Sequence, residues 1–321
     1  MDKDMDNLED PMTLARALSV YEDLRPSMPK AAPRSSQTAA RLRDVLDHFD
    51  ALLLDGYGVL NVGHEAVPGA LDLLNEARVR GIDVMVLTNG ASKPTAATVN
   101  KYHDFGLNLD PRQVVSSRDA LLAHLHQQQS NLKTYNLKTI GVVDGFVEGV
   151  EVEGITALPL TPDQPRAWLD VDAIGFFGAV HWHSGWQSCL VEAMATGVKV
   201  LVANPDVVAP HQGEFSREPG FWAAAAGFST NRIDQIEWFG KPHPPVFELA
   251  LERLEAFSAR PKLSKDRIAM VGDSLHTDIL GGQAAGLKTV LITGHGLFRQ
   301  GGAEDAIAST GITPDFITTT V

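Results

Sequence analysis

The sequence predicts an α/β protein, with a doubly wound, Rossmann-like parallel sheet and a second α/β domain inserted into it. Several short runs are apolar throughout, as expected of strands that are covered on both faces of a parallel sheet. Segments with helical periodicity alternate with these runs. Asp55, Thr88 and Asp273 each follow such a run directly. Ligands bind beyond the carboxyl ends of the strands in sheets of this kind, so these side chains mark the predicted site.

The N-terminal segment comes before the first predicted core strand. Residues 1–11 are acidic and are expected to be disordered. Residues 13–24 and 38–49 have helical periodicity, and a linker rich in Pro, Ser and Ala separates them over 26–37. Residues 1–48 are therefore predicted to form a helical extension of unassigned role.

The predicted core has two blocks of alternating strand and helix. Its strands are expected at residues 51–54, 83–87, 268–271 and 289–292. A helix is expected over 68–80, and another helix after Asp273. The two blocks lie far apart in the sequence, so a large insertion must separate them.

The region between the blocks contains its own apolar runs, at residues 139–143, 173–177 and 198–202. Its length suits an independent domain with hinges near Ser92 and Gly240. The resulting division assigns residues 49–92 and 241–321 to the core and residues 93–240 to an inserted α/β cap.

Composition limits the classes of partner. The chain has 321 residues, which exceeds the usual size of one domain, and its net charge of -13 disfavours nucleic acid and anionic membranes. No apolar run approaches 18 residues and the first residues do not resemble a signal peptide. The single cysteine, Cys189, is expected to be a small buried residue in a reducing compartment. The expectation is a cytoplasmic protein with a small-molecule substrate, and a homo-oligomer is left open.

The polar residues after the strands have types suited to phosphoryl chemistry. Asp55 can attack phosphorus, and the glycines beside it leave backbone N–H groups open to an anion. Thr88, Asn89 and Gly90 offer a hydroxyl, an amide and a backbone N–H at the next strand end. Each motif alone is common in turns and helix caps.

Two later motifs add charge of both signs. Lys241, in the segment FGKPHPPVF, can neutralise charge that develops between a carboxylate and a phosphoryl group. Asp273 and Asp278, in VGDSLHTD, provide the hard oxygen ligands that magnesium prefers. The order of the four motifs on successive strand ends is more specific than any one of them.

Together LLLDGYGVL, VLTNGAS, GKP and GDSLHTD resemble the four motifs of haloacid dehalogenase-like hydrolases, and the large insert with its Ala-Asn-Pro-Asp segment resembles class IIA members. The resemblance covers roughly residues 50–320. It implies Asp55 as nucleophile, Thr88, Asn89 and Gly90 as phosphate-binding residues, and Lys241 as the neutralising group. It also implies a magnesium site formed by Asp55, Asp273, Asp278 and the backbone carbonyl of Tyr57.

Tyr57 departs from the phosphatases of this superfamily, which usually have a general-acid Asp two positions after the nucleophile. Losing a positioned general acid costs about 10²–10⁴-fold in rate. A phenol with a pKa of about 10 replaces it poorly at neutral pH. The sequence therefore predicts slow turnover and a preference for aryl or acyl phosphates, whose leaving groups need little protonation.

Two other functions remain open. Tyr57 is also compatible with a phosphometabolite-binding protein that has lost efficient turnover. Asp-x-Tyr-Gly resembles the first motif of the haloacid dehalogenases, which cleave carbon–halogen bonds without magnesium. His181 and His183 could share a strand face and bind zinc, but only two ligands are evident, so surface or substrate contact is favoured. Trp182 and Trp186 could line the cap, although packing is the favoured interpretation.

Overall fold

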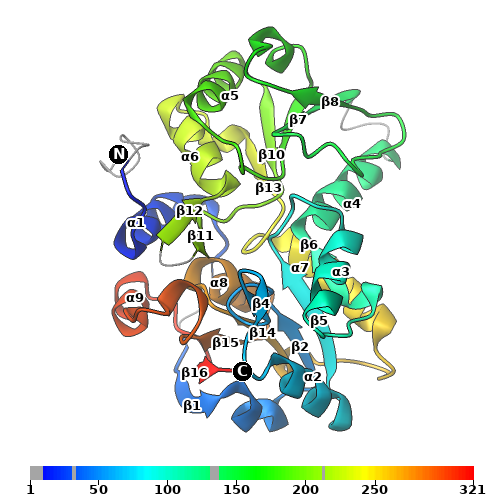
Figure 1. Ribbon diagram of the computed structural model, residues 1–321, viewed down its shortest axis with the longest axis vertical. Helices are drawn as coiled ribbons and strands as arrows, with labels where there is room; N and C mark the ends of the chain where they lie inside the picture. The colour runs from blue at the N-terminus through cyan, green and yellow to red at the C-terminus, as the bar shows by residue number, and fades with distance from the viewer. Residues whose placement is uncertain (1–9, 31–33, 131–136, 212–213) are drawn as a thin grey trace.

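The structure is a computed structural model, and it describes residues 10–30, 34–130, 137–211 and 214–321. It contains two parallel sheets of different size, which lie one above the other along the long axis of the molecule (Figure 1). The predicted α/β class, with a doubly wound core and a separate α/β cap, is confirmed.

The larger sheet has seven strands, and every pair of neighbours is parallel. In spatial order the strands are β1 (Gln37–Arg41), β16 (Phe316–Thr320), β15 (Lys288–Ile292), β14 (Ile268–Gly272), β2 (Ala51–Leu54), β5 (Asp83–Thr88) and β6 (Val114–Ser116). The four predicted core strands are β2, β5, β14 and β15. Because β2 lies between β14 and β5, the residue after it is placed beside the ends of both neighbours.

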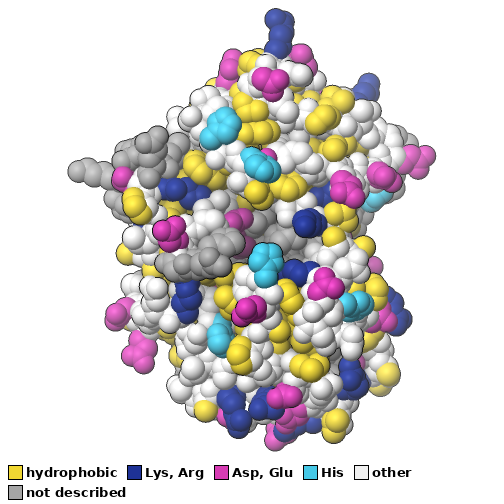
Figure 2. Space-filling model, viewed as in Figure 1, with side chains coloured by type: hydrophobic (Ala, Val, Ile, Leu, Met, Phe, Trp, Pro, Cys, Tyr) yellow, Lys and Arg dark blue, Asp and Glu magenta, His cyan; other side chains and the backbone are white. Residues whose placement is uncertain are grey.

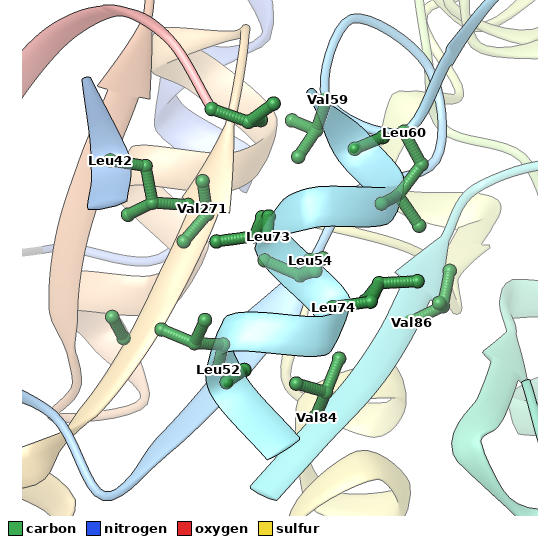
Figure 3. Packing of buried hydrophobic residues seen from close by; sticks show 14 of the residues in the cluster. Leu42, Leu52, Leu54, Val59, Leu60, Leu73, Leu74, Val84, Val86 and Val271 are labelled. Atoms are coloured by element: carbon green, nitrogen blue, oxygen red, sulfur yellow. The ribbon is translucent and has the colours of Figure 1, made fainter. Parts of the chain in front are cut away.

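Helices cover both faces of this sheet. The helices of the chain are α1 (Leu14–Leu24), α2 (Ala70–Val79), α3 (Thr95–Asp104), α4 (Ser117–Ser130), α5 (Ser184–Thr196), α6 (Pro219–Ser229), α7 (Pro244–Phe257), α8 (Leu280–Ala284) and α9 (Ala303–Thr310). Leu52 and Leu54 of β2 pack in one buried cluster with Leu73 of α2 (Figure 3). Leu53 packs in another cluster with Phe247 of α7. This alternation explains why the run 51–54 is apolar at every position.

The smaller sheet has five parallel strands, in the order β13 (Ile236–Trp238), β10 (Lys199–Val202), β9 (Ala173–Phe176), β7 (Thr139–Val143) and β8 (Thr156–Leu160). The predicted strands of the insert are β7, β9 and β10. Residues of α5 and α6 join the strands in one buried cluster. Two hairpins complete the fold: β3 (Asn61–Val62) with β4 (Glu65–Ala66), and β11 (Val208–His211) with β12 (Glu214–Arg217).

Two expectations at the edges of the core need correction. The first strand after residue 92, β6, pairs with β5 in the larger sheet, and α4 packs beside α7. A cap that began at residue 93 would therefore remove an edge strand of the core. We propose that the cap begins after α4 and that the chain re-enters the core near Gly240, as the sequence predicts.

The helix expected over 38–49 is wrong. Residues Gln37–Arg41 form the edge strand β1, and Leu42–His48 form a 3₁₀ turn. The strand is mostly exposed and has no apolar pattern. Backbone pairing with β16 holds it in the sheet, so its side chains need not be apolar. Leu42, Val45 and Leu46 have the spacing of a helix and are buried, so the periodicity came from the turn alone. The N-terminal segment is thus not wholly helical.

The part of the expected disordered start up to residue 9 lies outside the described residues. None of the described helices combines the length and the apolar character needed to cross a membrane. On the face drawn in Figure 2, lysine and arginine side chains are interspersed with acidic ones, so neither sign of charge gathers there.

Candidate active site

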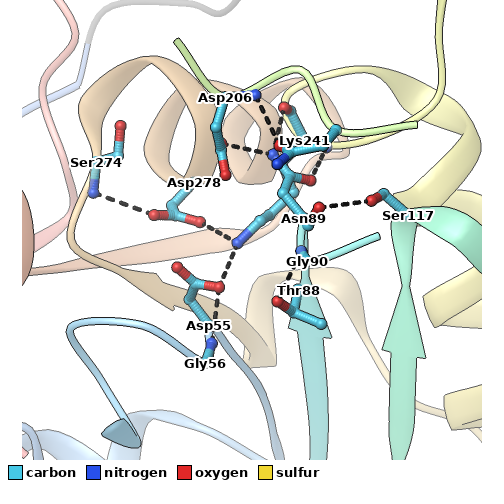
Figure 4. A network of polar contacts seen from close by, with 11 residues as sticks. Asp55, Gly56, Thr88, Asn89, Gly90, Ser117, Asp206, Lys241, Ser274 and Asp278 are labelled. Atoms are coloured by element: carbon cyan, nitrogen blue, oxygen red, sulfur yellow. Dashed lines mark hydrogen bonds and ion pairs between the residues drawn. The ribbon is translucent and has the colours of Figure 1, made fainter. Parts of the chain in front are cut away.

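Asp55 lies at the carboxyl end of β2, in the centre of the larger sheet. Its backbone N–H donates to the carbonyl of Val271 at 2.8 Å, and Leu54 pairs with both Val271 and Val86. This register brings the residues that follow β14 and β5 to either side of Asp55. Three motifs that lie far apart in the sequence therefore meet at one edge of the sheet (Figure 4).

Lys241 joins two of the carboxylates. Its Nζ lies 2.7 Å from Asp55 Oδ1 and 2.7 Å from Asp278 Oδ1, and the residue is only 1% exposed. Burial alone would lower the pKa of this ammonium, but the neighbouring carboxylates, Asp278 first, raise it above its ordinary value. Lys241 therefore stays charged and compensates part of the negative charge around it.

Asp55, Asp273 and Asp278 form a buried carboxylate cluster, with one oxygen of each within 4.8 Å of the others. The Leu297 N–H donates to Asp273 Oδ2 at 2.7 Å, and the Ser274 N–H donates to Asp278 Oδ2 at 3.1 Å. A π-helical turn over Leu275–Ile279 brings Asp278 back towards Asp273.

Burial raises the pKa of both Asp273 and Asp278, and the charges of neighbouring carboxylates raise them further. One ammonium does not balance three such carboxylates. The donor set of hard oxygens with excess negative charge fits a divalent cation such as magnesium.

The loop after Asp55 is held against this cluster by Gly58. Its φ of +75° is one that residues with a side chain rarely adopt, and an added Cβ would lie 2.8 Å from the side chain of Asp273. The Asp55 Oδ1 accepts a hydrogen bond from the Gly56 N–H at 2.7 Å. The backbone carbonyl of Tyr57, which the sequence predicts as a magnesium ligand, belongs to the same loop as Gly56 and Gly58.

The side chain of Tyr57 points towards the cap. Its hydroxyl donates a short hydrogen bond to the backbone carbonyl of Pro210 in β11. Burial raises the pKa of the phenol above its ordinary value. Tyr57 therefore links core and cap, and its proton is already committed to a protein acceptor.

The structure brings the second motif to the same edge, with different tasks for its residues. The Gly90 N–H donates to Thr88 Oγ1 at 3.1 Å, which leaves the Thr88 hydroxyl free to donate elsewhere. The Asn89 side chain is 2% exposed; it accepts from the Lys241 N–H at 2.7 Å and donates to Asp206 Oδ1 at 2.8 Å. Asn89 thus links the backbone of Lys241 to Asp206 of the cap, a role that the sequence did not predict.

A cavity of about 200 Å³ lies over these residues. Its lining includes Asp55, Tyr57, Thr88, Asn89, Gly90 and Asp273. It also includes Tyr21, Lys101, Asn204, Asp206 and Glu218, for which the sequence offered no role beyond the Ala-Asn-Pro-Asp resemblance. These residues come from the N-terminal segment, from α3 and from the cap, so only the folded chain reveals them as neighbours of Asp55.

Among the added residues, Asp206 has a strongly raised pKa. Burial raises the pKa of its carboxyl to about 8, although Lys241 and the Asn89 hydrogen bond act in the opposite direction. Asp206 is therefore largely protonated at neutral pH when no cation or ligand is bound.

The other candidates lie away from this edge. His181 Nδ1 lies 2.8 Å from Asp144 Oδ1 with its side chain 76% exposed, and His183 caps α5 through the Gly185 N–H. Within the described part of the chain, the carboxylate cluster is the only group of three or more potential metal ligands, so the zinc alternative has no support. Trp182 and Trp186 stack in the cap core, with their ring centroids 5.7 Å apart, so they pack as expected. Cys189 is buried, also as expected.

Comparisons with known proteins agree with this geometry. Residues 52–151 match the model of haloacid dehalogenase-like hydrolases, and residues 238–321 match a second model of the same superfamily, described as HAD-hydrolase-like. An acid sugar phosphatase of Staphylococcus epidermidis is 26% identical over 245 residues, which are 76% of this chain and 86% of the relative.

Two solved structures illustrate the shared fold. A possible sugar phosphatase of the HAD superfamily from Cytophaga hutchinsonii has a TM-score of 0.72 and 25% identity, covering 89% of this chain and 98% of that chain. The 4-nitrophenylphosphatase of Thermotoga maritima has a TM-score of 0.67 and 22% identity, covering 86% of this chain and 96% of that chain.

With the four motifs gathered at one edge of the core sheet, the chain belongs to the haloacid dehalogenase-like hydrolase superfamily. Within that superfamily it is a phosphatase of the class IIA type, with an α/β cap inserted between the second and third motifs.

Proposed function

We propose that this protein is a magnesium-dependent phosphohydrolase that cleaves a small phosphorylated metabolite through an aspartyl-phosphate on Asp55. The observation that carries the proposal is the contact of Lys241 Nζ with Asp55 Oδ1, 2.7 Å apart, beside two further buried carboxylates and next to a cavity lined by both core and cap. The cavity volume of about 200 Å³ suits a small substrate. The sugar phosphatases among the relatives make a sugar phosphate or a similar metabolite the first candidate.

The two oxygens of Asp55 have different environments. Oδ1 accepts from the Gly56 N–H and contacts Lys241, whereas no donor among the described residues reaches Oδ2. Oδ2 is therefore the oxygen available to attack phosphorus. The P–O ester bond breaks as the new P–O bond forms, and the leaving oxygen takes its proton from water, because the Tyr57 hydroxyl already donates to Pro210. A second water then hydrolyses the aspartyl-phosphate, which releases inorganic phosphate and regenerates the Asp55 carboxylate.

The remaining residues orient the phosphoryl group. The Thr88 hydroxyl donates to a phosphoryl oxygen, and Lys241 neutralises charge between that group and Asp55. Asp55, Asp273, Asp278 and the carbonyl of Tyr57 would hold magnesium, which when bound polarises the phosphoryl oxygens. Cap residues such as Asp206, Val208 and Pro210 line the cavity and so reduce the access of bulk water to it.

A screen of phosphate esters with and without magnesium tests this function. We expect hydrolysis of p-nitrophenyl phosphate that a chelator abolishes, and a loss on the order of 10³-fold or more for Asp55→Asn, which removes the nucleophile. Activity that survived the chelator, or that survived in the variant, would reject the proposal. Metal-independent activity on a haloacid would instead favour carbon–halogen hydrolysis.

A second candidate is a phosphometabolite-binding protein with little turnover. The observation in its favour is the Tyr57 hydroxyl, which donates to Pro210 and so is not available to protonate a leaving group. If a missing acid limits turnover, Tyr57→Asp should raise the rate on alkyl phosphates by about tenfold or more. Tyr57→Phe is the matched control, because it removes the Pro210 contact without adding an acid. Equal rates in both variants would reject an acid deficiency.

A further inference from the structure

The N-terminal helix α1 packs against both the core and the cap. Its buried residues Ala17, Val20, Tyr21 and Leu24 follow the spacing of one helix face. They share a hydrophobic cluster with residues from both parts of the molecule. The cap side contributes Val207, Val208, Phe221, Ala224 and Ala225, and the core contributes Leu275, Ile279, Leu280, Leu291, Leu297 and Phe298. Figure 1 draws α1 at the junction of the two parts, beside β11 and β12. The segment is thus built into the molecule next to the active site.

Tyr21 is the residue of α1 that reaches the cavity. It lines the same cavity as Asp55 and is 2% exposed. Its ring stacks on that of His276, with centroids 4.8 Å apart and planes 6° apart. Glu22, the next residue, contacts His276 Nε2 at 2.6 Å. His276, in the turn that carries Asp278, therefore contacts α1 twice, through the ring of Tyr21 and the carboxylate of Glu22.

The hydroxyl of Tyr21 has one hydrogen-bond partner among the described residues. It accepts a hydrogen bond from the Val207 N–H at 3.1 Å. Within the described residues no acceptor takes its proton, so the group is a donor without an acceptor on a cavity wall. Burial raises the pKa of this phenol well above its ordinary value, so the proton remains on the oxygen.

The position of Tyr21 favours the leaving-group side of the cavity. Its hydroxyl partner Val207 lies in the cap segment directly after Asp206, whereas Asp55 follows strand β2 of the core. The phosphoryl side already has the Thr88 hydroxyl, Lys241 and the carboxylate cluster. Tyr21 instead belongs with Asn204, Asp206 and Glu218, whose oxygens can accept hydrogen bonds from the hydroxyls of a polyol.

We propose that Tyr21 is a specificity-determining residue of this active site, whose hydroxyl donates a hydrogen bond to a hydroxyl oxygen of the leaving group in a sugar or polyol monophosphate. The N-terminal segment is then part of the substrate-binding site. The inference rests on the proposed phosphatase function.

Tyr21→Phe in the full chain tests the inference, because it keeps the stacked ring and removes only the hydroxyl. The probes are p-nitrophenyl phosphate as substrate, glucose 6-phosphate as alternative substrate or competitive inhibitor, and inorganic phosphate as product inhibitor. We expect binding of glucose 6-phosphate, measured as KM or inhibition constant, to weaken about tenfold. The inhibition constant of phosphate and kcat on p-nitrophenyl phosphate should change less than about twofold.

Leu14→Ala is the matched control on the same helix. Leu14 packs near Gly302, away from the cavity, so this variant loosens α1 without altering the substrate wall. Thermal unfolding checks that both variants fold. A purely structural role for Tyr21 predicts that the two variants change the ratio of glucose 6-phosphate to p-nitrophenyl phosphate affinity equally, and that result would overturn the inference.

Two other results separate the possibilities. If Tyr21→Phe weakens inorganic phosphate as much as glucose 6-phosphate, the hydroxyl contacts the phosphoryl group and the leaving-group assignment is wrong. If glucose 6-phosphate does not bind to the wild-type protein, the assignment is also wrong. If the wild-type protein hydrolyses no phosphate ester with magnesium, the proposed function itself fails.

Discussion

The two walls of the cavity are built in different ways. The core wall consists of side chains at the ends of β2, β5 and β14, and Lys241 is buried behind it against Asp55. Each of these residues comes from a compact sequence motif. The outer wall comes from α1, α3 and the cap, whose residues have no common pattern in the sequence. In the proposed function the core wall supplies the charges for the chemistry, and the outer wall contacts the rest of the substrate. Substitutions in the two walls should therefore have different consequences.

The largest effect is expected at the core wall, for Lys241→Met. Without the ammonium, Asp55 and Asp278 are left buried and unpaired, which costs about 3–5 kcal/mol in free energy of unfolding without metal. Activity should fall on the order of 10³-fold for every substrate. Urea denaturation with and without magnesium measures the stability, and magnesium should restore more of it in the variant than in the wild type.

Lys288→Met is the matched control for that change. Its ammonium pairs with Asp315 at 2.9 Å but is 41% exposed, so its loss should cost less than about 1 kcal/mol. If the two lysine variants lost equal stability, the carboxylate cluster would not depend on Lys241 for compensation.

A smaller and pH-dependent effect is expected in the outer wall, for Asp206→Asn. Because the folded protein holds the pKa of Asp206 at about 8, compared with 3.8 ordinarily, it retains a proton that the unfolded chain releases. The stability that this proton provides is lost as pH rises from about 4 to about 8. The neutral amide does not titrate, so in chelator the variant should lose less stability over that window, by up to about 5 kcal/mol.

Urea denaturation at several pH values between 4 and 8 measures this difference. Parallel curves for the wild type and Asp206→Asn would mean that the carboxyl is ionised in the folded state at neutral pH. Activity on p-nitrophenyl phosphate should also fall less than in the Lys241 variant, because Asp206 does not contact Asp55.

The smallest effect is expected outside both walls, for His181→Ala. The imidazole is mostly exposed and pairs with Asp144, so its loss should change the free energy of unfolding by less than about 1 kcal/mol. Metal content, measured on the purified protein by elemental analysis, should be unchanged. Loss of one bound zinc per chain would show that this histidine is a ligand after all.

The strands were predictable because a buried parallel strand must be apolar on both faces. The run 51–54 has that composition, and the structure divides it between two buried clusters. Edge elements lacked this signal: β1 is mostly exposed and is held by backbone pairing, so it was mistaken for part of a helix. Likewise β6 is only three residues long, which is too short for periodicity to separate it from the cap.

The sequence by itself determined the class of fold, the order of the four motifs and the residues that form the carboxylate cluster, because each motif is local and follows a recognisable strand. The tertiary structure decided which distant residues share the cavity. Tyr21 lies 34 positions before Asp55, and Asp206 lies 151 positions after it. No local pattern encodes their approach, since it depends on the packing of α1 and the cap against the core. The structure also decided that Tyr57 points to Pro210, a direction that its place beside the nucleophile did not reveal.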